Sequence, residues 1–471
     1  MIRLAFAALA MVIAWPAAAQ LPPVVRQALD KAGVPETSVA AIVEPLDGRL
    51  PVVAHNPTAA MNPASVVKVI TTFAALELLG PAFTFGTDFL HTGEIANGVL
   101  QGDLHVRGGG DPQLTYERVW QAAHALRSRG VREIHGDIVL DRSFFAPLVH
   151  DPAKFDNEPR RAYNVGADAL LVNFNVVHFR FIPDARGVRV VPEPDLPNLE
   201  VASRLRPTAE PCRSFRGGIT YDVVEIGLMA TITFSGAYPA ACGERTWALS
   251  VLDPARFTEA NLRWLWSETG GVLRGKVRAG PVPPDAHPLY RHESEPLASL
   301  VRDMNKHSNN VLARHLFLAL SAPAAGGAEA RASAQRVAEW LRGRGIEASE
   351  LRLENGSGLS REERASAATL AAILRAAWSS PVMPELVSSL PVPGVDGTLR
   401  ARQGAAKGRA HLKGGTLSDV QSVAGYVLDR GGRRWIVVMM INDPRAGAAA
   451  AALDAIVEWT HEAAASARTR R

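Results

Sequence analysis

Apolar positions recur with a helical period in some parts of the chain and as short runs in others, and this alternation predicts its elements. Near the start, residues 20–33 follow the period of a helix, and two apolar runs flank Asp47-Gly48, a turn signal typical of a β-hairpin. Residues 65–79 form a second, largely apolar helical pattern that stops at Gly80. The chain is therefore predicted to open with a helix, a hairpin and a second helix.

The pattern changes after about residue 88, where glycines separate short segments. A strand, a helix and a strand are predicted in a βαβ-like unit over 104–107, 114–130 and 134–140. A proline-rich stretch over 280–288 indicates a boundary. Beyond it the pattern predicts two helices, two antiparallel strands and a last helix, over 297–304, 311–320, 423–428, 435–441 and 448–465. A unit of helices and sheet is thus interrupted by a long segment of different character.

The first 19 residues are predicted to be a secretory signal peptide. Arg3 gives a charged start, residues 4–15 are apolar, and Ala17-Ala18-Ala19 is a small-residue cleavage site. A membrane anchor is the alternative, but the apolar run is short for a span. No later segment has the pattern of a transmembrane helix. The mature chain is therefore expected to be exported and to contain no transmembrane segment.

The composition of the chain narrows the classes of function that it can have. The formal charge is +4 with 47% apolar residues, and the basic residues are scattered, so nucleic-acid binding is not predicted. The 13 histidines show no metal-ligand spacing, so we expect no metal and no other cofactor. Cys212 and Cys242 are the two cysteines. In an exported chain they are expected to form a disulfide, with two reduced thiols as the alternative.

Ser65 and Lys68 stand three residues apart in the second helix, so their side chains share one face. A lysine with a lowered pKa can take the proton of a serine hydroxyl, and free N–H groups at a helix N-terminus can bind an oxyanion. By chance alone, such a pair is usually a solvated serine and a surface lysine. Two features favour chemistry here: the chain has seven lysines against 44 arginines, and Lys68 lies in an apolar helix.

Two further polar segments stand between predicted elements. Ser308 and Asn310 lie between two predicted helices and could line a cleft, although a helix N-cap is the favoured interpretation of that turn taken alone. Lys413 lies near the edge of the predicted antiparallel sheet, and Gly414 and Gly415 beside it would let a ligand approach the backbone. An ordinary strand-edge lysine with turn glycines is the alternative.

Together the three patterns resemble a known set of sequence motifs. Ser65-x-x-Lys68, Ser308-Asn309-Asn310 and Lys413-Gly414-Gly415-Thr416 follow the order Ser-x-x-Lys, Ser-x-Asn, Lys-Thr-Gly of penicillin-binding proteins and serine β-lactamases. The long gap between the first two resembles the class C low-molecular-mass penicillin-binding proteins. These are the D-alanyl-D-alanine carboxypeptidases and endopeptidases of the penicillin-binding protein 4 type. Residues 355–361 and 395–399 add to a resemblance that spans the mature chain.

The resemblance implies a fold and a domain organisation. The fold is expected to be mixed α/β (α+β): a penicillin-recognising, transpeptidase-like domain with an antiparallel sheet and helices on both sides, split by a large mixed α/β insert. On this basis residues 20–88 and 290–471 form the catalytic domain after the signal peptide 1–19. Residues 89–289 form the insert, with two subdomains expected. The expected location is the periplasm.

The resemblance also implies an activity. The protein is expected to cleave D-Ala-D-Ala peptides in peptidoglycan stem peptides through an acyl-enzyme, and to be inhibited covalently by β-lactams. Ser65 is then the nucleophile and Lys68 its base. Ser308 relays a proton to the leaving amine, and Asn310 binds the substrate backbone. Lys413 is a cation that lowers the pKa of Lys68 and attracts the substrate carboxylate.

The same resemblance implies how the substrate is held. Backbone N–H groups of Ser65 and Thr416 are expected to form the oxyanion hole, and Gly415, Leu359 and Leu417 to line the substrate site. One position departs from the family pattern, because Gly414 stands where the motif has threonine. We expect weakened capture of a free carboxylate. A peptidoglycan-binding scaffold with weak or lost turnover is therefore one alternative, and a β-lactamase, which needs a deacylation base that we do not identify, is a less favoured one.

Overall fold

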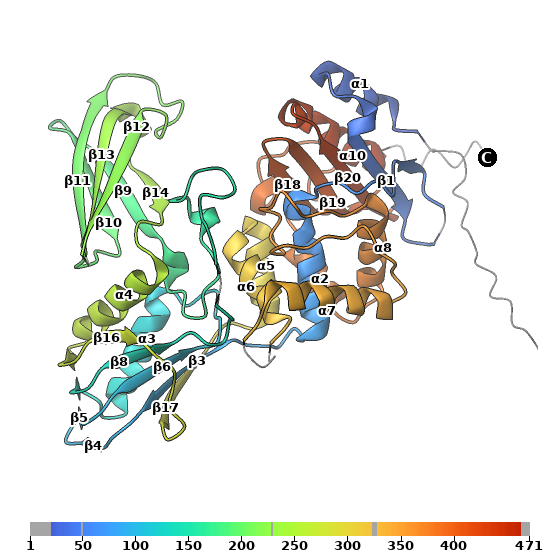
Figure 1. The fold of residues 1–471 in the computed structure, drawn as a ribbon. Coiled ribbons are helices and arrows are strands. Elements are labelled where there is room, and N and C mark those ends of the chain that lie inside the picture. Colours follow the sequence, from blue (N-terminus) through green and yellow to red (C-terminus); the bar gives the residue numbers. More distant parts are fainter. Residues whose placement is uncertain (1–19, 49, 148, 228, 323–326, 463–471) are drawn as a thin grey trace, which may run out of the picture.

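The computed structural model describes residues 20–48, 50–147, 149–227, 229–322 and 327–462. The predicted signal peptide, residues 1–19, lies outside this range. Figure 1 shows that the two ends of the chain form one part of the molecule, whereas its middle forms a second, elongated part. The candidate site residues all come from the first part, which is therefore described first.

A five-stranded sheet forms the centre of this part, with the strand order β18-β19-β20-β1-β2. All neighbouring strands pair antiparallel, and β18 is an edge strand. The strands are β1 Val39–Pro45, β2 Val53–His55, β18 Ala410–Leu417, β19 Val420–Leu428 and β20 Arg434–Asn442. The antiparallel sheet and the hairpin around Asp47-Gly48 are as predicted, and the fold is mixed α/β.

Both faces of this sheet are buried, because successive side chains of a strand point to opposite faces and each face carries helices. In β1, Ala40 and Ile42 enter one apolar core, whereas Ala41 and Val43 enter the other. The first core is shared with α2 Lys68–Leu78, α5 Leu297–His307, α6 Asn310–Ala319, α7 Ala330–Gly343, α8 Ala367–Trp378 and α9 Met383–Ser389. The second is shared with α1 Pro23–Ala32 and α10 Ala450–Glu462.

The middle of the chain builds several smaller sheets. One has the order β16-β8-β6-β3-β17, and its β6 and β8 pair parallel on either side of α3, as the predicted βαβ unit requires. A second, short sheet has the order β15-β7-β5-β4. The elements are β3 Gly86–His91, β4 Ile95–Ala96, β5 Val99–Leu100, β6 Leu104–Gly108, α3 Tyr116–Ser128, β7 Glu133–Ile134, β8 Ile138–Asp141, α4 Pro254–Glu268, β15 Val272–Leu273, β16 Val277–Ala279 and β17 His287–Glu293.

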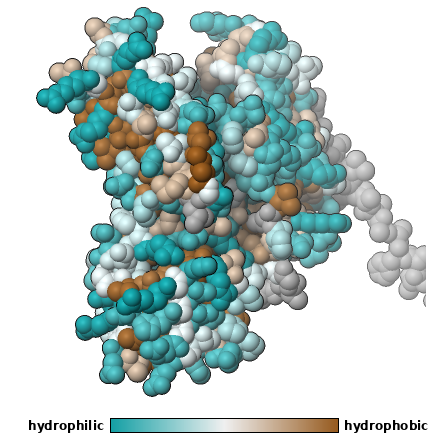
Figure 2. All heavy atoms as spheres, turned by 60° about the vertical axis from the view of Figure 1, so that its left-hand side comes forward, coloured by the Kyte–Doolittle hydropathy of each residue, from teal (hydrophilic) through white to brown (hydrophobic). Residues whose placement is uncertain are grey.

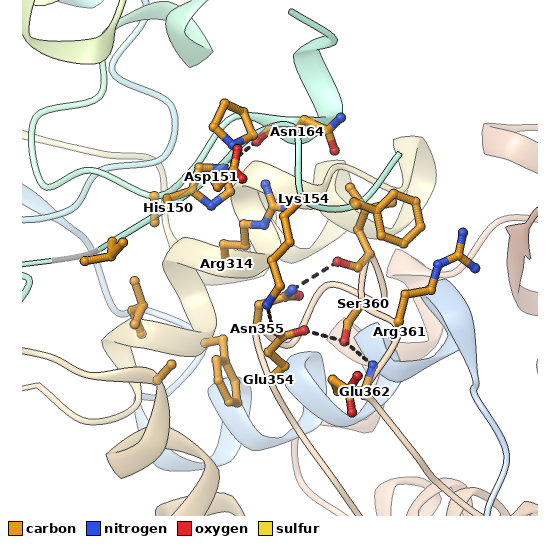
Figure 3. Close-up of a pocket in the computed structure, with 18 residues that line it drawn as sticks. His150, Asp151, Lys154, Asn164, Arg314, Glu354, Asn355, Ser360, Arg361 and Glu362 are labelled. Carbon is orange, nitrogen blue, oxygen red and sulfur yellow. Dashed lines mark hydrogen bonds and ion pairs between the residues drawn. The ribbon is translucent and has the colours of Figure 1, made fainter. Parts of the chain in front are cut away.

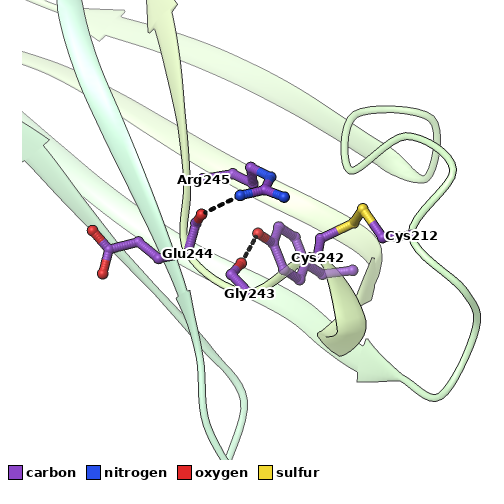
Figure 4. Close-up of a disulfide and its surroundings, with 6 residues drawn as sticks. Cys212, Cys242, Gly243, Glu244 and Arg245 are labelled. Carbon is purple, nitrogen blue, oxygen red and sulfur yellow. Dashed lines mark hydrogen bonds between the residues drawn. A yellow bond between two sulfur atoms is a disulfide. The ribbon is translucent and has the colours of Figure 1, made fainter.

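Two three-stranded sheets complete the middle part, with the orders β10-β9-β14 and β11-β13-β12. Their strands are β9 Val177–Pro183, β10 Val188–Glu193, β11 Leu199–Thr208, β12 Ile219–Ile226, β13 Met229–Pro239 and β14 Arg245–Leu249. A disulfide joins Cys212 to Cys242, so the expected pairing is formed (Figure 4). Figure 2 shows hydrophobic residues reaching the surface of this part of the molecule among hydrophilic ones. On β12, Val224 and Ile226 are exposed hydrophobic residues.

The two parts of the chain meet where β3 and β17 pair antiparallel. The predicted domain limits at 88/89 and 289/290 fall inside these two strands. From β17 the chain enters α5, whose C-terminal end carries Ser308. The β3–β17 strand pair therefore leads directly into an element that carries a candidate site residue.

Candidate active site

Ser65 lies in a 3₁₀ turn over Ala64–Val67, and the α-helix α2 begins only at Lys68. The predicted helix start at Ser65 was therefore wrong in type, although the side chains of Ser65 and Lys68 still meet. Ala64 has a left-handed backbone with φ +46°, a rare conformation for alanine. It is held there because its N–H donates to Asn62 Oδ1 at 2.9 Å. Surrounding contacts thus fix a strained turn just before the candidate nucleophile.

Lys68 is completely buried and has three oxygen neighbours. Its Nζ lies 3.0 Å from Ser65 Oγ and 2.8 Å from Asn310 Oδ1. It also donates to the carbonyl of Ser357. The sequence predicted the contact within the Ser65–Lys68 pair, and the fold adds Asn310 from α6 and Ser357 from the loop before α8.

Ser308 and Asn310 flank the turn between α5 and α6. Ser308 has φ +55° and ends α5, whereas Asn309 caps α6 by accepting the N–H of Leu312 at 3.1 Å. The N-cap expected in this turn is therefore provided by Asn309. This leaves the Ser308 hydroxyl free to accept a hydrogen bond from Lys413 Nζ at 2.8 Å.

Lys413 projects from the edge strand β18 and is as buried as Lys68. Besides Ser308, its Nζ donates to the carbonyl of Gly414 at 2.7 Å. Gly415 lies so close to the nucleophile that a Cβ there would stand 2.9 Å from the backbone nitrogen of Ser65. Absence of a side chain at this position is what lets β18 approach the 3₁₀ turn.

The remaining predicted residues lie around this centre. Thr416 is exposed, and its hydroxyl donates to Gln421 Oε1 at 3.2 Å. Leu417 ends β18 and is partly exposed. Leu359 is also partly exposed and belongs to the loop whose Gly358 packs on Ala64 and Ser65.

Burial and neighbouring charges set the acid–base properties of the two lysines. The pKa of Lys68 is held well below its ordinary value, first by burial and then by the Lys413 and Arg314 cations, whereas Glu363 opposes this. Burial alone lowers the pKa of Lys413 to about 7. Burial and the neighbouring cations therefore favour the neutral form of the Lys68 amine beside Ser65.

A cavity of about 290 Å³ lies between the loop 149–167 and the loop 354–362, and side chains of α6 line it (Figure 3). Arg314, one turn after Asn310, reaches into it and donates to the carbonyls of Tyr163 and Val165. Sequence patterns gave no indication of Arg314 or of Glu363, because each becomes significant only when distant loops fold together. Within the described ranges, no three His, Cys, Asp or Glu side chains gather to hold a metal ion.

Comparisons with known proteins agree with this architecture. The structure of penicillin-binding protein 4 (DacB) from Haemophilus influenzae superimposes with a TM-score of 0.77 at 24% identity, covering 92% of this chain and 99% of that one. A second structure of that protein contains a β-lactam. The fold is therefore that of penicillin-binding protein 4.

Sequence comparison identifies the family. A model of the D-Ala-D-Ala carboxypeptidase 3 (S13) family matches residues 24–463, and the chain belongs to this family. The D-alanyl-D-alanine carboxypeptidase of Actinomadura sp. strain R39 is 32% identical over 414 residues, or 84% of this chain and 76% of that one. DacB of H. influenzae is 27% identical, with 82% of both chains covered. The predicted family of serine D-Ala-D-Ala carboxypeptidases is confirmed.

Proposed function

We propose that this protein is a serine DD-peptidase that cleaves D-Ala-D-Ala bonds of peptidoglycan stem peptides through an acyl-enzyme at Ser65. Membership of the S13 family supports the reaction class. The observation that carries the assignment to Ser65 is its 3.0 Å contact with the buried amine of Lys68. A serine becomes an effective nucleophile when a neighbouring base of suitable pKa can take its proton.

In the first half-reaction, Ser65 Oγ attacks the carbonyl carbon between the two D-alanines, and its proton passes to Lys68. The C–N bond then breaks, and the leaving amine receives a proton through Ser308. Asn310 holds the substrate backbone, and Lys413 attracts the terminal carboxylate. The Ser308–Lys413 contact of 2.8 Å supports a shared role, because the cation polarises the hydroxyl.

The oxyanion of the tetrahedral intermediate is bound by the backbone N–H groups of Ser65 and Thr416. The close approach of Gly415 to Ser65 supports this assignment, since it draws the two backbones together. Leu359 and Leu417 line the substrate site. Water then attacks the ester carbonyl and gives a proton to Lys68. The C–O bond to Ser65 breaks, and Lys68 returns the proton to Ser65 Oγ as the shortened peptide leaves.

A β-lactam is expected to acylate Ser65 in the same way and to leave slowly. The β-lactam complex of the H. influenzae protein supports this expectation for a chain of the same fold.

Peptidoglycan is the proposed partner, and no metal or other cofactor takes part in the reaction as proposed. None of the described helices has the length and apolar character needed to cross a bilayer. We propose that the chain is exported to the periplasm and that its signal peptide is cleaved after residue 19. We also propose that the middle of the chain is a domain inserted into the catalytic domain, and that it begins and ends within the β3–β17 pair.

Gly414 favours one alternative function, a peptidoglycan-binding scaffold with weak turnover. A hydroxyl at this position would donate a hydrogen bond to a carboxylate, a contact of roughly 1.5–3 kcal/mol. Its absence is expected to lower carboxypeptidase activity about ten- to a hundredfold. Gly414 has room for a side chain, since the nearest atom to a Cβ would be 3.8 Å away, so Gly414→Thr is expected to raise the activity.

Release of D-alanine from a pentapeptide that ends in D-Ala-D-Ala tests the proposal. Wild type is expected to release D-alanine, and Lys68→Ala to release none, because Ser65 then has no base. Equal release by both proteins would refute the assignment of Lys68. A wild type that forms a penicillin adduct yet releases no D-alanine would favour the scaffold.

A further inference from the structure

Glu363 is a completely buried carboxylate close to the candidate catalytic centre. Its Oε1 accepts the backbone N–H groups of Asn355 at 3.1 Å and Gly356 at 2.8 Å, and its Oε2 accepts that of Gly358 at 2.9 Å. Donors thus converge on both oxygens. Hydrogen bonds donated to both oxygens favour the ionised form, whereas burial raises the pKa of Glu363.

The loop that Glu363 gathers faces the nucleophile and its base. Gly356 offers its carbonyl to the Thr71 hydroxyl on α2 at 2.7 Å, and Ser357 offers its carbonyl to Lys68 Nζ. Gly358, with φ +83°, packs so tightly that a Cβ would lie 2.1 Å from the carbonyl oxygen of Ala64. The carboxylate therefore holds the backbone that contacts both Lys68 and the turn of Ser65.

These contacts orient the amine of Lys68. The oxygens of Ser357 and Asn310 are acceptors only, and the amide nitrogen of Asn310 turns the other way toward the Tyr163 carbonyl. A neutral amine has two protons, and each of these oxygens takes one. The lone pair is then left for the third neighbour, the hydroxyl of Ser65.

The charges around Lys68 also affect how strongly its amine binds a proton. Lys413 from β18 and Arg314 from α6 lower the pKa of Lys68, whereas Glu363 raises it. A base with too low a pKa accepts a proton poorly, so an anion among buried cations keeps the amine basic. Glu363 therefore influences both where the amine points and how strongly it binds a proton.

We infer that Glu363 is a positioning residue for acylation, which aims the Lys68 lone pair at Ser65 through the loop 354–358 and balances the buried cations around it. The inference rests on the proposed roles of Ser65 and Lys68. The Glu363 carboxylate accepts hydrogen bonds from the backbone of this loop, so its effect on Ser65 passes through the loop and through the electric field at Lys68.

The test measures the rate of acylation by a fluorescent penicillin from about pH 5 to pH 9, a range that covers the titration of catalytic bases. Glu363→Gln removes the charge, so the pKa of Lys68 falls and the acidic limb of the profile moves to lower pH. Its maximal rate falls by roughly tenfold or more, because hydrogen bonds to a charged acceptor are lost. Glu363→Asp keeps the charge but shortens the reach, so its rate falls with the acidic limb unmoved.

Glu347→Gln removes an exposed carboxylate and is expected to match wild type in rate and profile. An acidic limb unmoved in Glu363→Gln, or a Glu363→Asp rate within about twofold of wild type, overturns the inference. If Glu363→Gln does not fold, Glu363→Asp alone decides. Failure of the proposed function gives a different result, since wild type itself would then form no adduct.

Discussion

At the residue scale, the site is built at a cost in stability. Lys68 and Lys413 are both fully buried, and neither has a carboxylate as hydrogen-bond partner within the described residues. Taking an amine out of water disfavours its charged form, so folding opposes protonation of these side chains. Active sites commonly retain such groups because the lowered pKa is useful in the reaction.

The cost at Lys413 predicts a pH dependence of stability. Its pKa is about 7 in the folded protein against an ordinary value of 10.5, so between these values the unfolded chain binds more protons. The unfolding free energy contributed by this group therefore rises with pH over that window. Lys413→Met removes the titration and is expected to melt with a shallower dependence on pH. Thermal melts of both proteins at several pH values check this, and identical slopes would contradict it.

At the scale of elements, the site depends on the approach of an edge strand to a 3₁₀ turn. A Cβ on Gly415 would lie 2.3 Å from Ser422 Oγ and 2.9 Å from the backbone nitrogen of Ser65, whereas one on Gly414 would meet nothing nearer than 3.8 Å. Adjacent glycines on β18 therefore differ sharply in what they tolerate. This difference makes them a matched pair of positions.

We predict that Gly415→Ala displaces β18 from the nucleophile and slows acylation by roughly ten- to a hundredfold, since small displacements of reacting groups are costly. Gly414→Ala is the control and is expected to acylate at nearly the wild-type rate. Stopped-flow measurement with a chromogenic β-lactam compares the two. Equal rates for the two variants would show that the close approach of β18 has no part in catalysis.

The pattern of apolar positions was sufficient to predict many of these elements. It predicted the hairpin around Asp47-Gly48, the antiparallel strands near the C-terminus and the βαβ unit, because each follows from local periodicity and turn signals. It could not give the 3₁₀ start at Ala64, which depends on contacts with Asn62 and Ser422. Nor could it identify Asn309 as the cap in place of Ser308.

Residues that act through tertiary contacts were beyond sequence reasoning for a physical reason. Glu363 sits in an ordinary polar loop, and its importance comes from backbone N–H groups that meet only after folding. The motif residues Ser65, Lys68, Ser308, Asn310 and Lys413 were found because their order resembles a known family. Their roles stay predictions until tested.

At the scale of the whole molecule, the middle of the chain both extends from the part that carries the candidate site and contacts it. Arg314 on α6 donates to carbonyls of the loop 163–165, and His315 Nδ1 contacts the carbonyl of Gly110 at 2.9 Å. The helix that carries Asn310 is therefore held by two segments from the middle of the chain. The β-sheets around the disulfide, by contrast, lie apart from the sheet β18-β19-β20-β1-β2 in Figure 1.

This separation predicts that the disulfide affects stability without affecting acylation. Cys212 and Cys242 enclose a loop with a sequence separation of 30, and loss of such a cross-link typically costs about 2–4 kcal/mol. Replacing both cysteines by serine is expected to lower the melting temperature of the protein and leave the penicillin acylation rate unchanged. Calorimetry and labelling measure the two properties. A parallel loss of acylation would indicate that these sheets are coupled to the site.

The central claim is that Ser65 is the residue acylated, with Lys68 as its base. Mass spectrometry of peptides from penicillin-treated protein tests it directly. The account predicts a penicilloyl adduct on the peptide that contains Ser65, and no adduct in Ser65→Ala or, at matched times, in Lys68→Ala. An adduct on another residue, or one that persists in Ser65→Ala, would contradict it.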